Sequence, residues 1–202
     1  SPPALSCSSS IGRTIMVDVA RATALALAQF PFNVGAFYGS STGLALGVGV
    51  ILDGATYPLF DENERLFDTV AGPAYVLTHE CDIDADNDRA FNDYVLICPI
   101  LCFATFAREF AAEQSEAALF GFIPDLAANR IFGALYIPPV GTSLPHGGIL
   151  YLNQICSTHV AMLRAPSARA LCALSQTAQR VVDFKLANQL LRPKADTLPR
   201  LR

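Results

Sequence analysis

The amino-acid sequence predicts an α+β fold in which a small, curved antiparallel β-barrel is packed by an N-terminal, a middle and a long C-terminal helix. Several short apolar runs, some with glycines inside them, alternate with turn residues, as in small closed barrels that leave no sheet edge exposed. Three longer segments place apolar residues three and four positions apart, which is typical of amphipathic helices. Because 202 residues that are 52% hydrophobic suffice for one core, residues 14–192 are expected to form a single globular domain.

The three expected helices are recognised by their periodicity and by the residues at their ends. Thr14 is a candidate N-cap of the first helix, and Pro31 stops it. The last helix follows Pro166 and ends before Pro193. The expected ranges are 14–30, 103–119 and 168–192, the last within a C-terminal segment 166–192. Residues 1–13 are expected to be a flexible leader, and residues 193–202 a frayed tail.

The expected strands are short runs rich in β-branched and aromatic residues, bounded by turn signals. They lie at 44–52, 55–60, 73–79, 93–99, 131–137 and 149–156. Asp53-Gly54 is expected to be a turn, and Pro99 is expected to end its strand. The barrel is therefore expected within residues 48–160, with the middle helix inserted into it.

The charge balance argues against general nucleic-acid binding. The formal net charge is −4 and the isoelectric point is about 5.3. Lysine and arginine form no cluster, apart from a few that are spread over the last residues of the chain. A protein that binds nucleic acid usually presents a positive stripe that displaces counterions from the phosphates. The composition therefore argues against nucleic acid as a partner.

Two further observations concern the environment of the chain. Residues 22–52 contain no charged side chain, and about 20 apolar residues suffice to cross a bilayer. Gln29, Pro31, Asn33 and several glycines interrupt this run, so a buried helix followed by strands is expected instead of a membrane span. The six cysteines are spread along the chain, mostly beside apolar runs, which predicts reduced thiols and a cytoplasmic protein.

The polar residues of greatest chemical interest lie in the stretch Gly72–Ile100. Two apolar, strand-like runs flank a loop that carries five aspartates, a cysteine and a histidine. Loops held by a rigid scaffold often carry function, because the scaffold fixes exposed polar groups in space. The segment 78–88 is therefore expected to form the rim of a site.

Part of the chain resembles the core of the MazF/PemK toxin family. The strings GVILDGATYPLFDENERLF, GPAYVLT and YVLICPI follow one another within residues 48–102 as the corresponding segments do in that family. The resemblance implies an SH3-like barrel. The family cuts single-stranded RNA with an arginine that opens the second strand and a serine or threonine after the Cys-Pro-Ile run. Here these positions hold Gly72 and either Leu101 or Cys102, so the electrostatic help to a phosphate transition state is lost.

A second resemblance is to a widespread bacterial group with a Thr-x-x-Cys-Asp-Ile signature, found in mobile-element and defence neighbourhoods. It is carried by VLTHECDI, in which Thr78, Cys81, Asp82 and Ile83 form the signature, and by VLICPI, FGALYIPP and ILYLNQI further along the chain. This resemblance implies a bacterial or phage origin.

The leading functional hypothesis is a non-catalytic module that binds a protein partner or a small ligand at the 78–88 rim. The candidate binding residues are Thr78, Glu80, Asp84 and Arg89. The helices offer a surface for a possible homodimer, and no cofactor is expected.

The alternative is an enzyme. One form is a hydrolase with Cys81 as nucleophile, for which His79, His146 and His159 are the available bases and Asp82 could orient the base. The other form is a divergent ribonuclease that uses Arg65 or Arg89 in place of the missing arginine.

A metal-binding structural protein is the third class. Five aspartates occupy positions 1, 3, 5, 7 and 12 of a calcium-loop spacing, namely Asp82, Asp84, Asp86, Asp88 and Asp93. A zinc site would draw on soft ligands spread along the chain, namely His79, Cys81, Cys98, Cys102, His146, Cys156 and His159.

Overall fold

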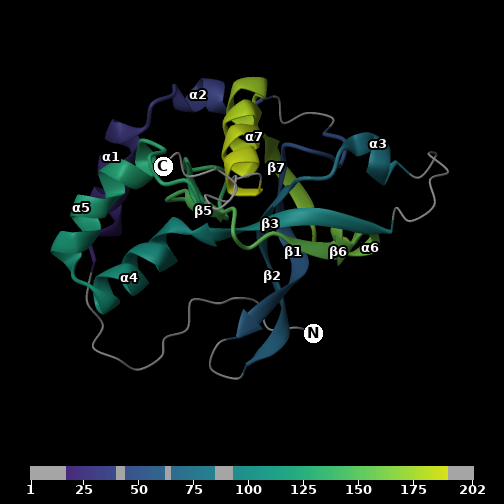
Figure 1. Ribbon diagram of the computed structural model, residues 1–202, viewed down its shortest axis with the longest axis horizontal. Coiled ribbons are helices and arrows are strands. Elements are labelled where there is room, and N and C mark those ends of the chain that lie inside the picture. The colour runs from purple at the N-terminus through teal and green to yellow at the C-terminus, as the bar shows by residue number, and fades with distance from the viewer. Residues whose placement is uncertain (1–16, 40–43, 62–64, 85–92, 191–202) are drawn as a thin grey trace, which may run out of the picture.

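The computed structural model describes residues 17–39, 44–61, 65–84 and 93–190, and in them the chain forms an α+β fold (Figure 1). The strands are β1 (Val50–Asp61), β2 (Leu66–Val76), β3 (Tyr94–Cys102), β4 (Ala134–Ile137), β5 (Gly148–Tyr151), β6 (Cys156–His159) and β7 (Arg169–Ala173). The helices are α1 (Val19–Gln29), α2 (Val34–Phe37), α3 (Glu80–Ile83), α4 (Phe103–Glu113), α5 (Glu116–Ala127), α6 (Val160–Leu163) and α7 (Gln176–Leu190).

The described strands form one seven-stranded antiparallel sheet in the order β4-β5-β3-β2-β1-β7, with β6 also paired to β3. The antiparallel sheet was expected, but the sheet is not closed into a barrel. The sheet branches at β3, because different parts of this long strand pair with β5 and with β6. Its residues Ile100, Leu101 and Cys102 pair with β5, whereas residues 94–97 of the same strand pair with β6.

Two expected breaks lie inside strands. Asp53-Gly54 is not a turn, because β1 continues through it with a bulge in its pairing to β2 between Leu52 and Ala55. Gly54 has a φ of 67°, and a Cβ there would collide with the carbonyl oxygen of Ser167, so the bulge requires glycine. Pro99 does not end β3, which continues to Cys102. Pro99 instead lies opposite Ala74 of β2.

Several expected elements are shorter than the sequence indicates or are divided. The strand expected over 44–52 begins only at Val50, and the strand expected over 149–156 is divided into β5 and β6. The helix expected over 103–119 is two helices, since Ser115 caps a new helix by accepting a hydrogen bond from Ala118 N. The first helix begins at Val19 with Asp18 as its cap, and the expected cap Thr14 lies outside the described residues.

The beginning of the long C-terminal helix was predicted wrongly. Residues 169–173 form strand β7, which pairs with β1, and α7 begins only at Gln176. Cys172 and Leu174 are buried in the core. Cys172 and Leu174 are buried at the alternate positions of extended backbone, whereas Leu171, Leu174 and Ala178 are spaced as on a helix, so periodicity alone does not separate the two.

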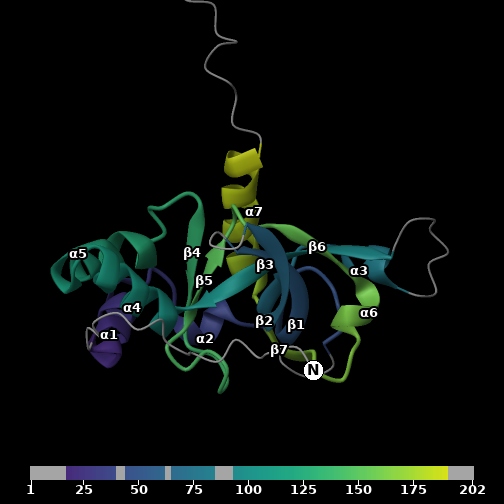
Figure 2. The same ribbon diagram turned by 90° about the horizontal axis from the view of Figure 1, so that it is seen from below.

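Helices gather at the two ends of the sheet. In both views α1, α4 and α5 lie together at one end, α3 and α6 lie at the other end, and α7 stands between them (Figures 1 and 2). No helix among the described residues is long and apolar enough to cross a membrane.

Residues 50–52 of β1, 74–76 of β2 and 97–98 of β3 are buried on both faces of the sheet, which produces two cores. The larger core, here called the helix-side core, contains Ile51, Tyr75 and Cys98 together with buried residues of α1, α4, α5 and α7. The smaller one, the corner core, contains the neighbouring strand residues that point the other way and one residue each of α3 and α6, namely Val50, Leu52, Ala55, Tyr57, Ala74, Val76, Ile83, Val95, Ile97 and Leu163. Burial on both faces explains why the strands are nearly continuous apolar runs.

A buried lysine attaches α7 to the segment between α5 and β4. Lys185 is 3% exposed, and its Nζ donates hydrogen bonds to the carbonyl oxygens of Asn129 at 3.1 Å, Ala134 at 2.9 Å and Ile131. Burial lowers the pKa of this ammonium. Three carbonyl acceptors match its three donors, so the buried charge is hydrogen-bonded throughout.

Candidate functional site

Two segments at the α3 and α6 end of the molecule have the same construction. Residues 78–84 read Thr-His-Glu-Cys-Asp-Ile-Asp and residues 158–164 read Thr-His-Val-Ala-Met-Leu-Arg. We call them the cysteine corner and the methionine corner. In each, a histidine precedes a single helical turn, and the last residue of that turn, Ile83 or Leu163, is buried in the corner core.

Both histidines cap their helices through the same atom. Nδ1 of His79 accepts a hydrogen bond from Cys81 N at 3.2 Å, and Nδ1 of His159 accepts one from Ala161 N at 3.1 Å. A ring nitrogen accepts a hydrogen bond through its lone pair, so Nδ1 is the acceptor atom in both caps. Both rings therefore cap their helices in the way that serine, aspartate or asparagine usually does at an N-cap.

The threonines attach the two corners to different strands. Thr78 Oγ1 accepts a hydrogen bond from Leu96 N of β3 at 2.8 Å. Thr158 Oγ1 donates one to the carbonyl oxygen of Thr56 in β1, also at 2.8 Å. These bonds fix each corner against the sheet, so the hydroxyl of Thr78 already has a structural partner.

Arg164 connects the two corners. It is the C-cap of α6, and its backbone N donates to Val160 O at 3.1 Å, just as Asp84 N donates to Glu80 O at 2.9 Å after α3. The guanidinium Nη2 of Arg164 donates to the carbonyl oxygen of Ile83 at 2.6 Å. The methionine corner thus supplies a donor to the end of the helix in the cysteine corner.

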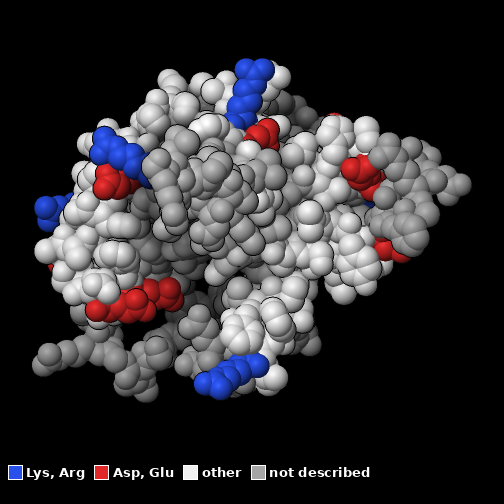
Figure 3. Space-filling view, viewed as in Figure 1, with Lys and Arg blue, Asp and Glu red and all other residues white. Residues whose placement is uncertain are grey.

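A hollow of about 460 Å³ lies beside the cysteine corner. It is lined by Ala45, Leu46, Glu80, Cys81, Ile83, Asp84 and Arg164. Figure 3 shows acidic side chains at this end of the surface, on the right of the view. Gly47 lets the preceding segment approach α3, because a Cβ at this position would lie 2.7 Å from the Cβ of Glu80. The hollow therefore combines apolar walls, two carboxylates, a guanidinium and an exposed thiol.

The structure gives the expected catalytic residues distinct positions. Cys81 is exposed, takes part in no disulfide, and lines the hollow. His79 binds the backbone of Cys81 through Nδ1, and its ring nitrogen lies 3.6 Å from Glu80 Oε2. Asp82 lies in α3, where its backbone N donates to His79 O. Of the expected binding residues, Glu80 and Asp84 meet in the hollow, and Arg89 lies outside the described residues.

The expected metal ligands do not converge in the part of the chain that the structure describes. No three histidine, cysteine, aspartate or glutamate side chains there could hold one ion. Cys98 is buried, donates to Tyr151 O at 2.9 Å, and has its pKa raised by burial to about 12. His146 Nδ1 lies 3.1 Å from Thr23 Oγ1. Asp86 and Asp88 of the calcium spacing lie outside the described residues, whereas Asp93 is exposed at the start of β3.

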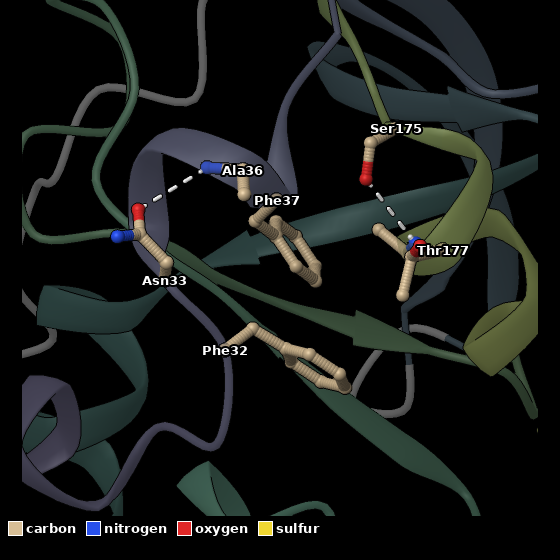
Figure 4. A pocket seen from close by; sticks show the side chains of 7 residues that line it. Phe32, Asn33, Ala36, Phe37, Ser175 and Thr177 are labelled. Carbon is tan, nitrogen blue, oxygen red and sulfur yellow. Dashed lines mark hydrogen bonds between the residues drawn. The ribbon is translucent and has the colours of Figure 1, made fainter.

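A second, smaller hollow of about 110 Å³ lies between α2 and the start of α7 (Figure 4). Two of its polar side chains, those of Asn33 and Ser175, already cap helices. Asn33 Oδ1 accepts from Gly35 N and Ala36 N, and Ser175 Oγ accepts from Ala178 N. It has no charged lining residue, so the hollow at the cysteine corner is the better candidate.

Sequence reasoning missed the methionine corner and the lining residues Ala45, Leu46 and Arg164. The available signal was the repeated Thr-His pair with an apolar residue five positions after each threonine. Comparisons of the chain with protein-family models, with curated proteins and with solved structures found no match.

Proposed function

We propose that the protein is a non-catalytic binding module that takes a segment of a partner protein or a small ligand into the hollow at the cysteine corner. The observation that carries this proposal is the hollow itself, in which the apolar Leu46 and Ile83 lie beside the carboxylates of Glu80 and Asp84. Concave sites with apolar walls and a few convergent polar groups are the usual form of ligand sites.

The lining favours a ligand that carries an apolar group and a positive charge. The lining carries the carboxylates of Glu80 and Asp84 and the guanidinium of Arg164, so it has one more formal negative charge than positive. An excess of negative charge attracts cations. An arginine or lysine next to a leucine in a partner segment has this chemistry.

The test uses two small probes, N-acetyl-leucyl-arginine amide and phenethylamine, and follows backbone amide signals by NMR. We expect shifts at residues 45–46 and 80–84. Removing a carboxylate weakens attraction to the probe, so Glu80→Gln and Asp84→Asn should each reduce affinity about threefold to tenfold. The matched control is Asp125→Asn in α5, where the carboxylate pairs with exposed Arg130. Shifts that spread over the whole surface, or that persist in both variants, would contradict the proposal.

A second candidate is a hydrolase that uses Cys81, which the exposed thiol in the hollow supports. Iodoacetamide at neutral pH distinguishes it, since a catalytic thiolate alkylates faster than ordinary thiols. Burial raises the pKa of Cys98 to about 12 and of Cys172 to about 11, so these two serve as slow internal references. A Cys81 rate no greater than that of a small-molecule thiol such as glutathione would remove the hydrolase.

We infer an SH3-like arrangement from the order in which strands pair. Strand β7 pairs with β1, β1 with β2, β2 with β3, and β3 with β6, while the one-turn helix α6 lies between β6 and β7. Ribonuclease activity has less support, because Gly72 and either Leu101 or Cys102 stand where the toxin family has its catalytic groups. Arg65 remains as the replacement, exposed beside Leu66. RNA cleavage lost in Arg65→Ala would establish that activity, and no cleavage by the unaltered protein would end it.

A further inference from the structure

One segment of this chain carries the chemistry that the hollow at the cysteine corner favours. Residues 191–202, here called the basic segment, follow α7, lie outside the described residues and read Leu-Arg-Pro-Lys-Ala-Asp-Thr-Leu-Pro-Arg-Leu-Arg. Four of these twelve residues are basic and one is acidic, in a chain whose formal net charge is −4. A leucine directly precedes an arginine at 191–192 and again at 201–202. The basic segment therefore combines an apolar and a cationic group, as the lining of the hollow requires.

The charges of the basic segment and of the hollow are opposite in sign. The lining holds the carboxylates of Glu80 and Asp84 and the guanidinium of Arg164. The next residues of the sequence, 85–93, contain three aspartates and one arginine, so the chain stays acidic beyond the cysteine corner. Opposite charges steer two surfaces toward each other and select the way in which they meet.

The hollow lies close enough to the end of α7 for the basic segment of the same molecule to reach it. A Cβ at Gly49 would collide with the side chain of Gln179, so α7 passes Gly49 within the length of one side chain, about 7 Å. From Gln179 the helix rises about 17 Å to Leu190. Leu46, in the wall of the hollow, precedes Gly49 by three residues, which span at most about 11 Å. Leu46 therefore lies within about 35 Å of Leu190, and twelve residues span up to about 40 Å.

We propose that residues 198–202 of the basic segment occupy the hollow of the same molecule. Leu201 packs against Leu46 and Ile83, and the arginines on either side of it face the two carboxylates. The segment then competes with the ligand, and this competition rests on the proposed function, whereas the docking of the segment does not. Since a short tether holds its end at an effective concentration on the order of 1 mM, a weak contact is enough to keep the hollow mostly occupied.

The first measurement uses the unaltered full chain with labelled leucine and isoleucine methyl groups. We expect nuclear Overhauser contacts from the methyl groups of Leu201 to those of Ile83, and they should persist when the protein is diluted, because a contact within one molecule does not depend on concentration. Contacts that weaken on dilution, together with a dimer in sedimentation, would show that a second copy supplies the segment. That result, or the absence of these contacts, would overturn the proposal.

Two variants remove the apolar and the cationic part of the contact separately, namely Leu201→Ser and the double variant Arg200→Gln/Arg202→Gln. In both, the backbone amide signals of residues 45–46 and 80–84 should shift in the absence of any ligand. N-acetyl-leucyl-arginine amide should bind each variant about threefold more tightly than the unaltered chain, because the probe no longer has to displace the segment.

The matched control is Arg192→Gln/Lys194→Gln. It removes the same charge from the part of the basic segment next to α7, and it should leave both the amide signals at the hollow and the affinity for the probe unchanged. Equal shifts in the control and in Arg200→Gln/Arg202→Gln would mean a general effect of charge and would contradict docking of residues 198–202.

Failure of this inference and failure of the proposed function give different results. If the probe binds the unaltered chain and all variants equally, and the amide signals at the hollow do not differ among them, the segment does not dock and the proposed function stands. If the methyl contacts are present but the probe binds neither the unaltered chain nor any variant, the segment docks and the proposed function is wrong.

Discussion

The two corners have the same backbone construction but differ most in the first three residues of the helical turn. Glu80, Cys81 and Asp82 occupy the turn in one corner, and Val160, Ala161 and Met162 occupy it in the other. Threonine, histidine and the final isoleucine or leucine are shared, and each has a structural partner in both corners. The shared residues build the corner. Of the residues that differ, Glu80, Cys81 and Asp84 of the cysteine corner and Arg164 of the methionine corner line the hollow, so both corners contribute side chains to it.

The largest effect is expected from alkaline pH, which ionises buried side chains of the strands on which both cores are built. Cys98 of β3 and Tyr57 of β1 each have a pKa raised by burial to about 12. Their contribution to stability is complete below about pH 9, where an unfolded thiol begins to ionise, and is lost as pH rises toward 12. For Cys98 alone the loss at full deprotonation is about 4 kcal/mol. Urea unfolding between pH 8 and pH 11 measures it, and a flat free energy of unfolding across that range would be inconsistent with both raised pKa values.

The next effect compares the buried anchors of the two corners. Ile83→Ala and Leu163→Ala each remove a side chain that is 4% exposed in the corner core. Each should lower the free energy of unfolding by about 3 kcal/mol, the usual cost of such a cavity. Denaturant titration measures both variants, and Met162→Ala, at an exposed position, is the control. A cost below about 1 kcal/mol for either variant would mean that its corner is not anchored as the other is.

A change at Gly47 should affect the cysteine corner alone. In Gly47→Ala the new Cβ would lie 2.7 Å from the Cβ of Glu80, so α3 must move away from residues 44–47. Overpacking of this kind costs about 2 kcal/mol. Hydrogen exchange should accelerate at residues 80–84 and stay unchanged at residues 160–164. Equal acceleration in both corners would show that they are more tightly coupled than the bond from Arg164 to Ile83 implies.

The smallest effect tests that bond. Arg164→Gln shortens the side chain, so the donor to Ile83 O is lost, and the free energy of unfolding should fall by about 1 kcal/mol. The helix of the methionine corner keeps its own backbone bond from residue 164 to Val160. Exchange should therefore accelerate at Ile83 and Asp84 only. A larger acceleration of exchange in the methionine corner than at Ile83 and Asp84 would show that the bond stabilises the methionine corner more than the cysteine corner.

The sequence predicted the α+β class of the fold, but it wrongly predicted that the sheet closes into a barrel. The α+β composition, the antiparallel pairing and the core of the middle helices follow from local periodicity. Closure, in contrast, depends on which strand pairs with which edge of β3, and no local pattern encodes that. The bulge at Gly54 depends on the carbonyl of Ser167, more than a hundred residues away in sequence. From the local sequence alone, the Asp-Gly pair was therefore predicted to be a turn, although it lies inside β1.

The candidate site was predicted in part for the same reason. Glu80, Cys81 and Asp84 were recognised because their side chains stand together in one loop. Arg164 was missed because it reaches the hollow from another segment of the chain. The resemblance between the corners was hidden because only the Thr-His pair is identical, and two residues are too few to be noticed as a repeat.

The buried contact of Lys185 limits which residues that position can hold. Three carbonyl oxygens converge on one ammonium, and they come from residues 129, 131 and 134. Methionine would fill the space but leave those oxygens without donors. Arginine holds its donors in a plane and cannot point them at three oxygens around one centre. Among relatives of this chain, lysine at the midpoint of the final helix should therefore be exchanged less often than the leucines around it.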